Sequence, residues 1–368
     1  MEFNDVRLQY EQFSEEIDSA IRAVLSSGRF ILGPTVEAFE EDFARYCKCA
    51  SGIGVASGTD ALRIALSAAG VGAGDEVLVP AVTAAATAMA VMQLQATPVF
   101  VDIHPEEFTM DPADAMEKKS SRTKAVIPVH LYGMPARLKE LSALRVPLIE
   151  DACQAHGSVA PWGPCGSFGI AAAFSFYPTK NLGTYGDGGM IVTSDGEIAE
   201  RARLLRNYGQ REHYSSAVPG DNSRLDELHA GILRLKLKRL DGWNRRRREI
   251  AVTYRAAFAE MPVTTQTETG NSNYHLFAVA SSRRDELRQH LLEQGIPTAI
   301  HYPTPLHRQK AFENLGPARS RHCPNAEQLC GRVFSLPMHP SLASHEVDRV
   351  ISAMRAFHAA VSKKREDS

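Results

Sequence analysis

The chain has 368 residues, 44% of them hydrophobic, and its 41 lysines and arginines nearly balance its 43 aspartates and glutamates, giving a formal net charge of −2. This length accommodates one large and one small domain around a sizeable core. The balanced charge gives no reason to expect nucleic acid as a partner. The lack of any run of about eighteen apolar residues argues against a membrane span.

Cysteine and histidine follow no disulfide or metal-binding pattern, although the chain has six cysteines and thirteen histidines. Cys47 and Cys49 are too close together for a common zinc motif, and no second pair accompanies them. The polar, acidic start at Met1 to Asp5 does not resemble a signal peptide. We therefore expect a cytoplasmic protein with free thiols and no bound metal.

Helix and strand patterns alternate along the chain up to about residue 260. Helical periodicity is predicted at 11–27 and 35–46, and again at 60–69, 83–94 and 138–144. Short apolar runs predict strands at 53–56, 77–80, 98–101, 125–129, 148–150, 171–176 and 190–193. Repeated strand–helix units predict an α/β fold whose mainly parallel sheet of seven strands is covered by helices on both faces.

The last third of the chain changes in pattern. One long helix is predicted at 226–255, with its basic run Arg245 to Arg248 on a solvated face. Strand, helix and strand patterns follow at 274–280, 285–294 and 296–300. We therefore predict a large domain at 1–260, which includes the N-terminal helices and the long helix, and a smaller C-terminal α+β domain at 261–368.

Three segments at strand ends carry the candidate chemistry, and the first is the turn that contains Ser57, Gly58 and Thr59. It follows the apolar stretch 53–56 and opens a helical pattern. Small residues there let backbone N–H groups and a hydroxyl approach a phosphate at a helix N-terminus. The same residues also serve as ordinary helix caps, so this segment alone is a weak signal.

The second segment ends an apolar run with Glu150 and Asp151, and Gln154 follows shortly after. A carboxylate at the carboxyl end of a parallel strand faces the crevice where ligands bind in α/β sheets. Beside a pyridine nitrogen, such an acid would keep the ring protonated. A simple helix-capping or turn role is the alternative for Asp151.

The third segment contains Ser175 and, five residues later, Lys180, followed by a glycine-rich turn. A deprotonated lysine is a nucleophile that forms a Schiff base with a carbonyl, and pyridoxal phosphate (PLP) enzymes hold their cofactor in this way. An isolated lysine is usually a solvated surface residue. The order of the three segments is what favours a PLP site.

Through these three segments and several others, the chain resembles the DegT/DnrJ/EryC1/StrS family of PLP-dependent sugar aminotransferases over most of its length. The resemblance implies fold type I, the aspartate aminotransferase-like fold. The matching segments are Phe39-Glu40, SGTDAL at 57–62, GDEV at 74–77, PVFVD at 98–102, PVHLYG at 128–133, EDACQAHG at 150–157, SFYPTKNLG at 175–183, NSRLDE at 222–227, YHLF at 274–277 and SLP at 335–337.

The resemblance implies a role for each matching residue. Lys180 and Asp151 would be the catalytic residues, with Lys180 bound to PLP and Asp151 at the pyridine nitrogen. Gln154 would contact the ring hydroxyl oxygen, and Gly58, Thr59 and Ser175 would hold the phosphate. Asn222 would reach the phosphate of the neighbouring subunit, which implies a homodimer with composite active sites. As an alternative, Asn222 is a turn residue.

One position departs from the family. An aromatic residue that stacks on the PLP ring commonly follows the threonine of the P-x-x-T segment, but here Thr83 is followed by Ala84. The sequence therefore leaves undecided which residue covers the PLP ring. The candidate substrate-binding residues are Tyr185, Tyr302 and His307, for which packing roles are equally reasonable.

The leading functional prediction is transfer of the amino group of L-glutamate, with 2-oxoglutarate as the product, to a keto group of a nucleotide-linked deoxy-keto-sugar. Asp187, where many 4-keto enzymes carry glutamate, favours sugar carbon 3. A 4-keto-sugar or aminocyclitol aminotransferase is the alternative. The resemblance leaves two further readings. A related sugar dehydratase would carry histidine at the position of Lys180, and a non-catalytic PLP-binding regulatory protein would not need Lys180, Asp151 and Gln154 intact.

Overall fold

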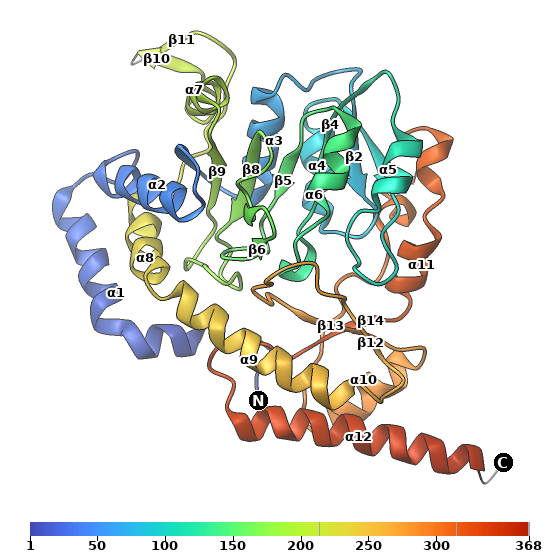
Figure 1. The fold of residues 1–368 in the computed structure, drawn as a ribbon. Helices are drawn as coiled ribbons and strands as arrows, with labels where there is room; N and C mark the ends of the chain where they lie inside the picture. The colour runs from blue at the N-terminus through green and yellow to red at the C-terminus, as the bar shows by residue number, and fades with distance from the viewer. Residues whose placement is uncertain (213, 314, 367–368) are drawn as a thin grey trace.

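A central β-sheet organises the first part of the computed structural model, which describes residues 1–212, 214–313 and 315–366. Each predicted apolar run up to residue 193 contains a strand of this sheet (Figure 1). Three strands pair in parallel in the order β3 (Thr97–Val101), β2 (Glu76–Pro80) and β4 (Thr123–Val126). Four others follow the order β1 (Ser51–Val55), β9 (Gly189–Thr193), β8 (Ala171–Ser175) and β5 (Ile149–Asp151).

The two groups of strands meet between β4 and β5. Parallel bridges join Val126 to Leu148 and Val129 to Asp151, so the groups continue one another. β5 and β8 are parallel, whereas β9 is antiparallel to both of its neighbours. The sheet is therefore mixed, with its parallel strands ending at a common edge.

Helices cover both faces of this sheet because its strands are apolar on both sides. α3 (Gly58–Ala68), α4 (Ala85–Met92) and α7 (Gly196–Leu205) pack on one face, with Ala171, Ala173 and Ile191. On the other face α2 (Pro34–Tyr46) and α8 (Glu227–Leu237) cover β8 and β9, and α5 (Pro112–Lys118) and α6 (Leu138–Leu141) cover β2, β3 and β4.

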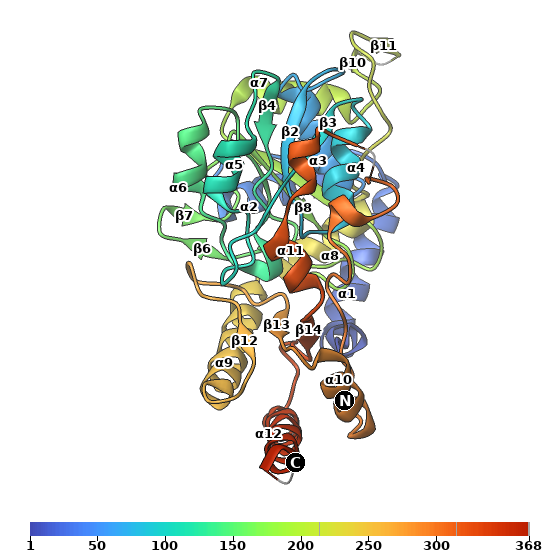
Figure 2. The same ribbon diagram turned by 90° about the vertical axis from the view of Figure 1, so that its right-hand side faces the viewer.

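The remaining short elements lie in the connections of this part of the chain. They are η1 (Leu131–Gly133), η2 (Ser142–Leu144), β6 (Val159–Ala160), β7 (Gly163–Pro164), β10 (Gln210–Glu212) and β11 (Ser215–Ser216). The β10–β11 hairpin projects away from the body of the molecule (Figures 1 and 2).

The predicted long helix at 226–255 is two helices, α8 and α9 (Leu240–Phe258), which are separated at Lys238 and Arg239. α1 (Arg7–Ser27) packs against α8. The prediction of a solvated basic face is wrong for Arg247, which is buried. Its guanidinium donates to the carbonyls of Tyr274, His275 and Met338, and these carbonyls compensate its lost hydration.

A smaller antiparallel sheet, β12 (Thr264–Thr265), β13 (Phe277–Ala280) and β14 (Val333–Leu336), lies below the central one in Figure 1. It shares an apolar core with α9, α10 (Arg284–Glu293) and α12 (Ser344–Glu366). The predicted strand at 296–300 is wrong, since only a single bridge from Ala299 to Ser335 forms there. The domain boundary at 260 stays a prediction.

The segment that contains η3 (Leu306–Arg308), η4 (Ala318–Arg321) and α11 (Pro324–Cys330) returns to the central sheet. Leu306 donates its N–H to Ala81 O at 2.8 Å. The Asp102 carboxylate caps α11 by accepting from the N–H groups of Asn325 and Ala326. Figure 2 shows α11 beside the central sheet and away from α12.

Candidate active site

A cavity of about 240 Å³ lies at the carboxyl ends of the parallel strands. The end of β5, the end of β8 and the N-terminal ends of α3 and α4 meet there. This convergence brings together six residues that the sequence predicted as a cofactor site, namely Gly58, Thr59, Asp151, Gln154, Ser175 and Lys180.

The N-terminus of α3 forms one wall of the cavity. Ser57 caps the helix by accepting from Asp60 N at 3.1 Å. The first N–H groups of a helix have no intrahelical acceptor, so Gly58 and Thr59 can present theirs to an anion in the cavity. A Cβ on Gly58 would lie 2.7 Å from Ser175 Cβ and 2.9 Å from Cys153 Sγ. Only glycine at position 58 therefore allows the start of α3 to approach Ser175 and Cys153 this closely.

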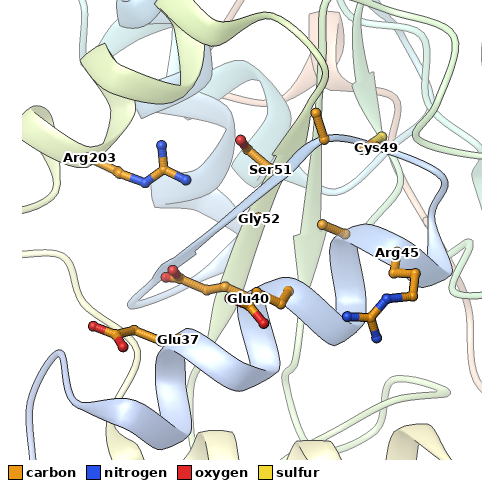
Figure 3. Close-up of a pocket in the computed structure, with 10 residues that line it drawn as sticks. Glu37, Glu40, Arg45, Cys49, Ser51, Gly52 and Arg203 are labelled. Carbon is orange, nitrogen blue, oxygen red and sulfur yellow. The ribbon is translucent and has the colours of Figure 1, made fainter.

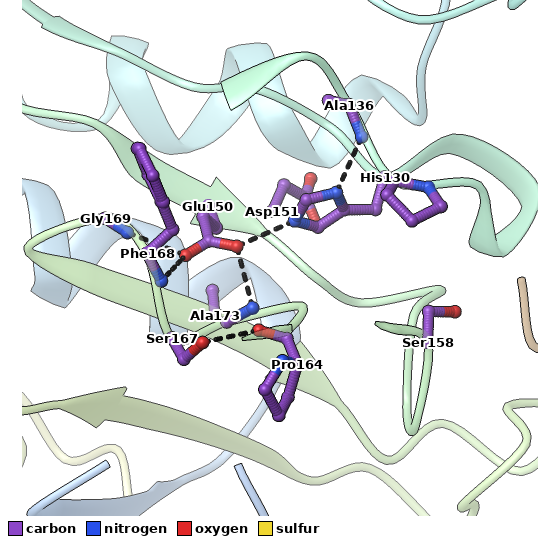
Figure 4. Close-up of polar contacts among 12 residues, drawn as sticks. His130, Ala136, Glu150, Asp151, Ser158, Pro164, Ser167, Phe168, Gly169 and Ala173 are labelled. Carbon is purple, nitrogen blue, oxygen red and sulfur yellow. Dashed lines mark hydrogen bonds and ion pairs between the residues drawn. The ribbon is translucent and has the colours of Figure 1, made fainter. Parts of the chain in front are cut away.

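Of the two adjacent carboxylates on β5, only Asp151 lines the cavity. Successive side chains of a strand point to opposite faces, and Glu150 points away into a buried polar cluster (Figure 4). Its carboxylate accepts from the amides of Gly166, Phe168 and Gly169. Burial alone would raise the pKa of Glu150, but the hydrogen bond from His130 and these amides lower it below its usual value.

His130 completes that cluster and shows why Glu150 is structural. Its Nδ1 accepts from Ala136 N at 3.0 Å, so Nε2 carries the ring proton and donates to Glu150 Oε2 at 2.8 Å (Figure 4). The pair links the loop after β4 to β5, and the amides that donate to Glu150 tie β5 to the loop before β8. It therefore holds β5 in register, with Asp151 facing the cavity.

The Asp151 carboxylate accepts two hydrogen bonds from within the chain. Thr87 Oγ1 donates to Oδ2 at 2.8 Å, and Cys153 N donates to Oδ1 at 3.2 Å. Asp151 is buried, with 5% of its surface exposed. These donors fix the orientation of a buried acid at the floor of the cavity.

Lys180 follows β8 through a tight turn in which its N–H donates to Tyr177 O at 2.8 Å. Burial lowers the pKa of Lys180, and the nearby Cys153 and Asp151 offset part of that effect. A lower pKa increases the fraction of neutral amine, which is the nucleophilic form. The next residue, Asn181, anchors the turn by donating to Asn244 Oδ1 and Asn273 O.

Gln154 connects the cavity to Tyr302. Its Oε1 accepts from Tyr132 N at 2.6 Å, and its Nε2 donates to Tyr302 Oη at 3.1 Å. Tyr302 itself is half-buried, and burial raises its pKa to about 12, so the phenol stays protonated. Tyr302 is therefore beside a cavity residue, and its role as a substrate contact stays a prediction.

The other predicted residues lie outside this cavity. Tyr185 packs edge-on against Tyr10 and lies under Lys236 Nζ, which is 4.0 Å from the centre of its ring. His307 is buried, and its Nε2 contacts Glu327 Oε1 at 2.9 Å. Asn222 is exposed and bridges Asn207. Within one chain, these residues and the cofactor residues do not form a single site.

Several residues that line the cavity were not assigned to it by the sequence. Thr87 and Cys153 contact Asp151, and Tyr177 and Asp187 come from the same connection as Lys180. The helical spacing from Thr83 to Thr87 is a signal that could have found Thr87. Ala84 lines the cavity too, so the position where the family carries an aromatic residue is a short apolar wall.

A larger cavity, of about 550 Å³, lies at the other edge of the sheet, among α2, β1 and α7 (Figure 3). Charged side chains line it, including Glu37, Glu41 and Arg203. Glu40 is already paired with Arg206 and accepts from Gly54 N. The chemistry of the residues, rather than the volume, therefore selects the smaller cavity as the candidate site.

The smaller cavity fits PLP in each respect that the chain itself can show. A helix N-terminus with a close-approach glycine suits its phosphate, a buried acid suits its pyridine nitrogen, and a half-buried lysine whose pKa is lowered suits its aldehyde. The fold and site thus define an α/β transferase of the PLP-dependent class.

Comparison with known proteins agrees. The model of the DegT/DnrJ/EryC1/StrS aminotransferase family matches residues 11–355, so the chain belongs to this family. It is similar to the dTDP-3-amino-3,4,6-trideoxy-alpha-D-glucose transaminase of Streptomyces venezuelae, with 45% identity over 96% of this chain and 95% of that protein.

Two further similarities extend this result. The UDP-N-acetyl-3-dehydro-alpha-D-glucosamine 3-aminotransferase of Acidithiobacillus ferrooxidans is 41% identical over 95% of this chain and 96% of its own. The crystal structure of DesV from S. venezuelae superposes with a TM-score of 0.94 and 44% identity, covering 97% of this chain and 98% of that one. The fold type I architecture is therefore confirmed, and the chain is an aminotransferase.

Among the described residues, no helix is long and apolar enough to cross a membrane. No cluster of three or more histidine, cysteine, aspartate or glutamate side chains in that part of the chain is arranged to hold a metal ion.

Proposed function

We propose that this PLP-dependent aminotransferase transfers the amino group of L-glutamate to a nucleotide-linked keto-sugar, at sugar carbon 3. The observation that carries the substrate class is the similarity, over nearly the whole chain, to two transaminases named for 3-amino sugars. One of these proteins is named for a dTDP-linked sugar and the other for a UDP-linked sugar, so the identity of the nucleotide is undecided. The presence of Asp187 in the cavity wall next to Lys180 supports the position.

Each cofactor residue has a chemical task in this reaction. Bound PLP supplies an electron sink that stabilises negative charge at the carbon next to the amino group. Lys180 would hold the cofactor through its Nζ and, when free of it, would move a proton at that atom, for which its lowered pKa is suited. Asp151 would hold a proton on the ring nitrogen, Gln154 would orient the ring hydroxyl oxygen, and Gly58, Thr59 and Ser175 would bind the phosphate.

The active unit would be a homodimer in the cytoplasm. Asn222 is exposed and is not among the residues that line the cavity of its own chain, which suits a contact across a subunit boundary. The six cysteines are free, as expected in a reducing compartment. Tyr185, Tyr302 and His307 remain candidate contacts for the sugar nucleotide.

The reverse reaction tests the proposal, because amino-sugar nucleotides are convenient substrates. The enzyme is incubated with 2-oxoglutarate and a panel of 3-amino and 4-amino sugar nucleotides, each with dTDP or UDP. We expect glutamate release from 3-amino compounds, measured enzymatically, and no release by the Lys180→Ala control.

Other outcomes of this assay change specific parts of the proposal. Release only from 4-amino compounds would refute carbon 3 and leave the keto-sugar class intact. If an aminocyclitol is added to the panel and is the only compound that releases glutamate, it would replace the nucleotide-sugar class. In a separate measurement, a cofactor spectrum that changes with alanine but not with L-glutamate would refute the donor.

A further inference from the structure

Two buried threonines connect the start of α4 to the acid at the floor of the cavity. Thr83 and Thr87 are 2% and 0% exposed, and their Oγ1 atoms lie 3.1 Å apart. Thr87 Oγ1 also lies 2.8 Å from Asp151 Oδ2. The three side chains therefore form a continuous chain of hydrogen bonds that ends on Asp151.

The direction of this hydrogen-bond chain follows from proton counting. A hydroxyl has a single proton to donate, whereas an ionised carboxylate only accepts. The proton of Thr87 is therefore committed to Asp151 Oδ2. With Asp151 ionised, Thr83 must then donate to the oxygen of Thr87, so the hydrogen bonds run from Thr83 through Thr87 to Asp151.

We propose that Thr87, supported by Thr83, is a positioning residue that holds Asp151 as an ionised acceptor aimed at the cofactor ring. Cys153 N occupies the other carboxylate oxygen at 3.2 Å. Donors on both oxygens restrict rotation of the carboxylate while leaving lone pairs for the ring nitrogen. The inference rests on the proposed role of Asp151 and adds to it the groups that keep this acid oriented.

The natural test is affinity for PLP, measured by equilibrium dialysis of the apo-protein. Thr87→Val removes the hydroxyl and keeps the shape, and we expect it to weaken PLP binding about tenfold, the size expected for one hydrogen bond to a charged group. Thr87→Ser keeps the hydroxyl and should bind within about twofold of the native protein. Native affinity in Thr87→Val would overturn the proposal.

A matched control separates this effect from the general cost of replacing a buried threonine. Thr109 is 1% exposed, and its Oγ1 has no hydrogen-bond partner in the described part of the chain. It lies outside the cavity, so Thr109→Val should leave PLP affinity unchanged. A loss in Thr109→Val equal to that in Thr87→Val would show a non-specific effect and would also overturn the proposal.

A double-mutant cycle tests whether Thr87 acts through Asp151. In an Asp151→Ala background, Thr87→Val should weaken PLP binding by less than about twofold, because the partner is already missing. An equal loss in both backgrounds would refute the coupling. If Thr87→Val does not fold, Thr83→Val should weaken binding about threefold in the native background only, and native affinity in that variant would refute the chain of hydrogen bonds.

The same measurements distinguish this inference from the function on which it rests. If Asp151→Ala binds PLP as well as the native protein, the role of Asp151 is wrong and the inference fails with it. If Asp151→Ala binds weakly while Thr87→Val binds normally, only the inference fails.

Discussion

At the residue scale, electrostatics couple Lys180 to two buried histidines, His156 and His275, and to the half-buried His301. Burial lowers the pKa of His156 to about 3 and that of His301 to about 4, and it lowers the pKa of His275 well below its usual value. The positive charge of Lys180 contributes to all three shifts. The rings therefore stay neutral at working pH, which limits the charge collected around the cofactor site.

His156 gives this arrangement a measurable pH dependence. Its ring contacts Phe43, Phe174 and Phe176, and neither of its nitrogens has a hydrogen-bond partner among the described residues. The unfolded chain takes up a proton at His156 below about pH 6.5, whereas the folded protein resists it until about pH 3. The stability that His156 contributes is therefore present above pH 6.5 and lost as the pH falls.

We predict that His156→Phe removes part of the acid sensitivity of folding. Between pH 7 and pH 5 the native protein should lose about 2 kcal/mol of unfolding free energy, relative to the variant, because only the native chain titrates at this position. Urea unfolding of both apo-proteins at the two pH values measures the difference. The exposed His345, changed to Phe, is the control and should show no such change. Parallel pH curves for native and His156→Phe proteins would refute the prediction.

At the outer edge of the central sheet, two side chains provide hydrogen bonds to β1 that a neighbouring strand would otherwise provide. β1 pairs only with β9 among the described strands, which leaves its outer edge without a strand partner. Glu40 on α2 accepts from Gly54 N at 2.7 Å, and Arg206 donates to Gly54 O at 2.9 Å. Glu40 and Arg206 also pair with each other and are both buried. The ion pair thus satisfies the backbone N–H and C=O groups of Gly54 at the outer edge of β1, as a neighbouring strand would.

We predict that Glu40→Ala destabilises the protein by about 3 kcal/mol or more, because it leaves the Arg206 charge buried and Gly54 N without its acceptor. The neighbouring Glu41 is exposed on the same helix, so Glu41→Ala should change stability by less than about 0.5 kcal/mol. Urea unfolding at pH 7 measures both. Equal effects of the two substitutions would show that the buried pair contributes no more than a surface carboxylate.

The whole-molecule question is how Asn222 relates to the cofactor site. Asn222 and Asn207 are partners in an isolated antiparallel bridge at the base of the β10–β11 segment, and this hairpin projects from the body of the molecule (Figure 1). The cavity around Lys180 is lined by other segments. A site shared between two subunits would reconcile the proposed phosphate contact of Asn222 with this placement, and two-fold dimers are the commonest assemblies.

We predict that mixing inactive Lys180→Ala and Asn222→Ala subunits restores activity. In a heterodimer with composite sites, one site carries both changes and the other carries neither, so up to about half of the native activity per heterodimer should return. Transaminase activity is measured after subunit exchange, which differently tagged chains can verify by co-purification. If verified heterodimers stay inactive and the Asn222→Ala parent is defective, Asn222 acts within its own subunit.

Local patterns in the sequence were sufficient for the strands of the central sheet and for six of the residues that line the candidate cavity. Each predicted apolar run up to residue 193 becomes a buried strand, and glycine, acid and lysine at strand ends reach a common edge because parallel strands end together. The predictions at 226–255 and 296–300 failed because periodicity does not show where two helices separate or whether a partner strand lies within reach.

The tertiary structure decided what depends on contacts between distant segments. Only the packed fold shows that Glu150 turns toward His130 while Asp151 faces the cavity, that Thr87 reaches Asp151, and that Arg247 is buried among backbone carbonyls. The sequence by itself determined the fold, the cofactor and the reaction class, because its motifs carry the resemblance to a family that has them. Orientation, burial and charge balance at each residue depend on neighbours remote along the chain, which only the folded molecule brings together.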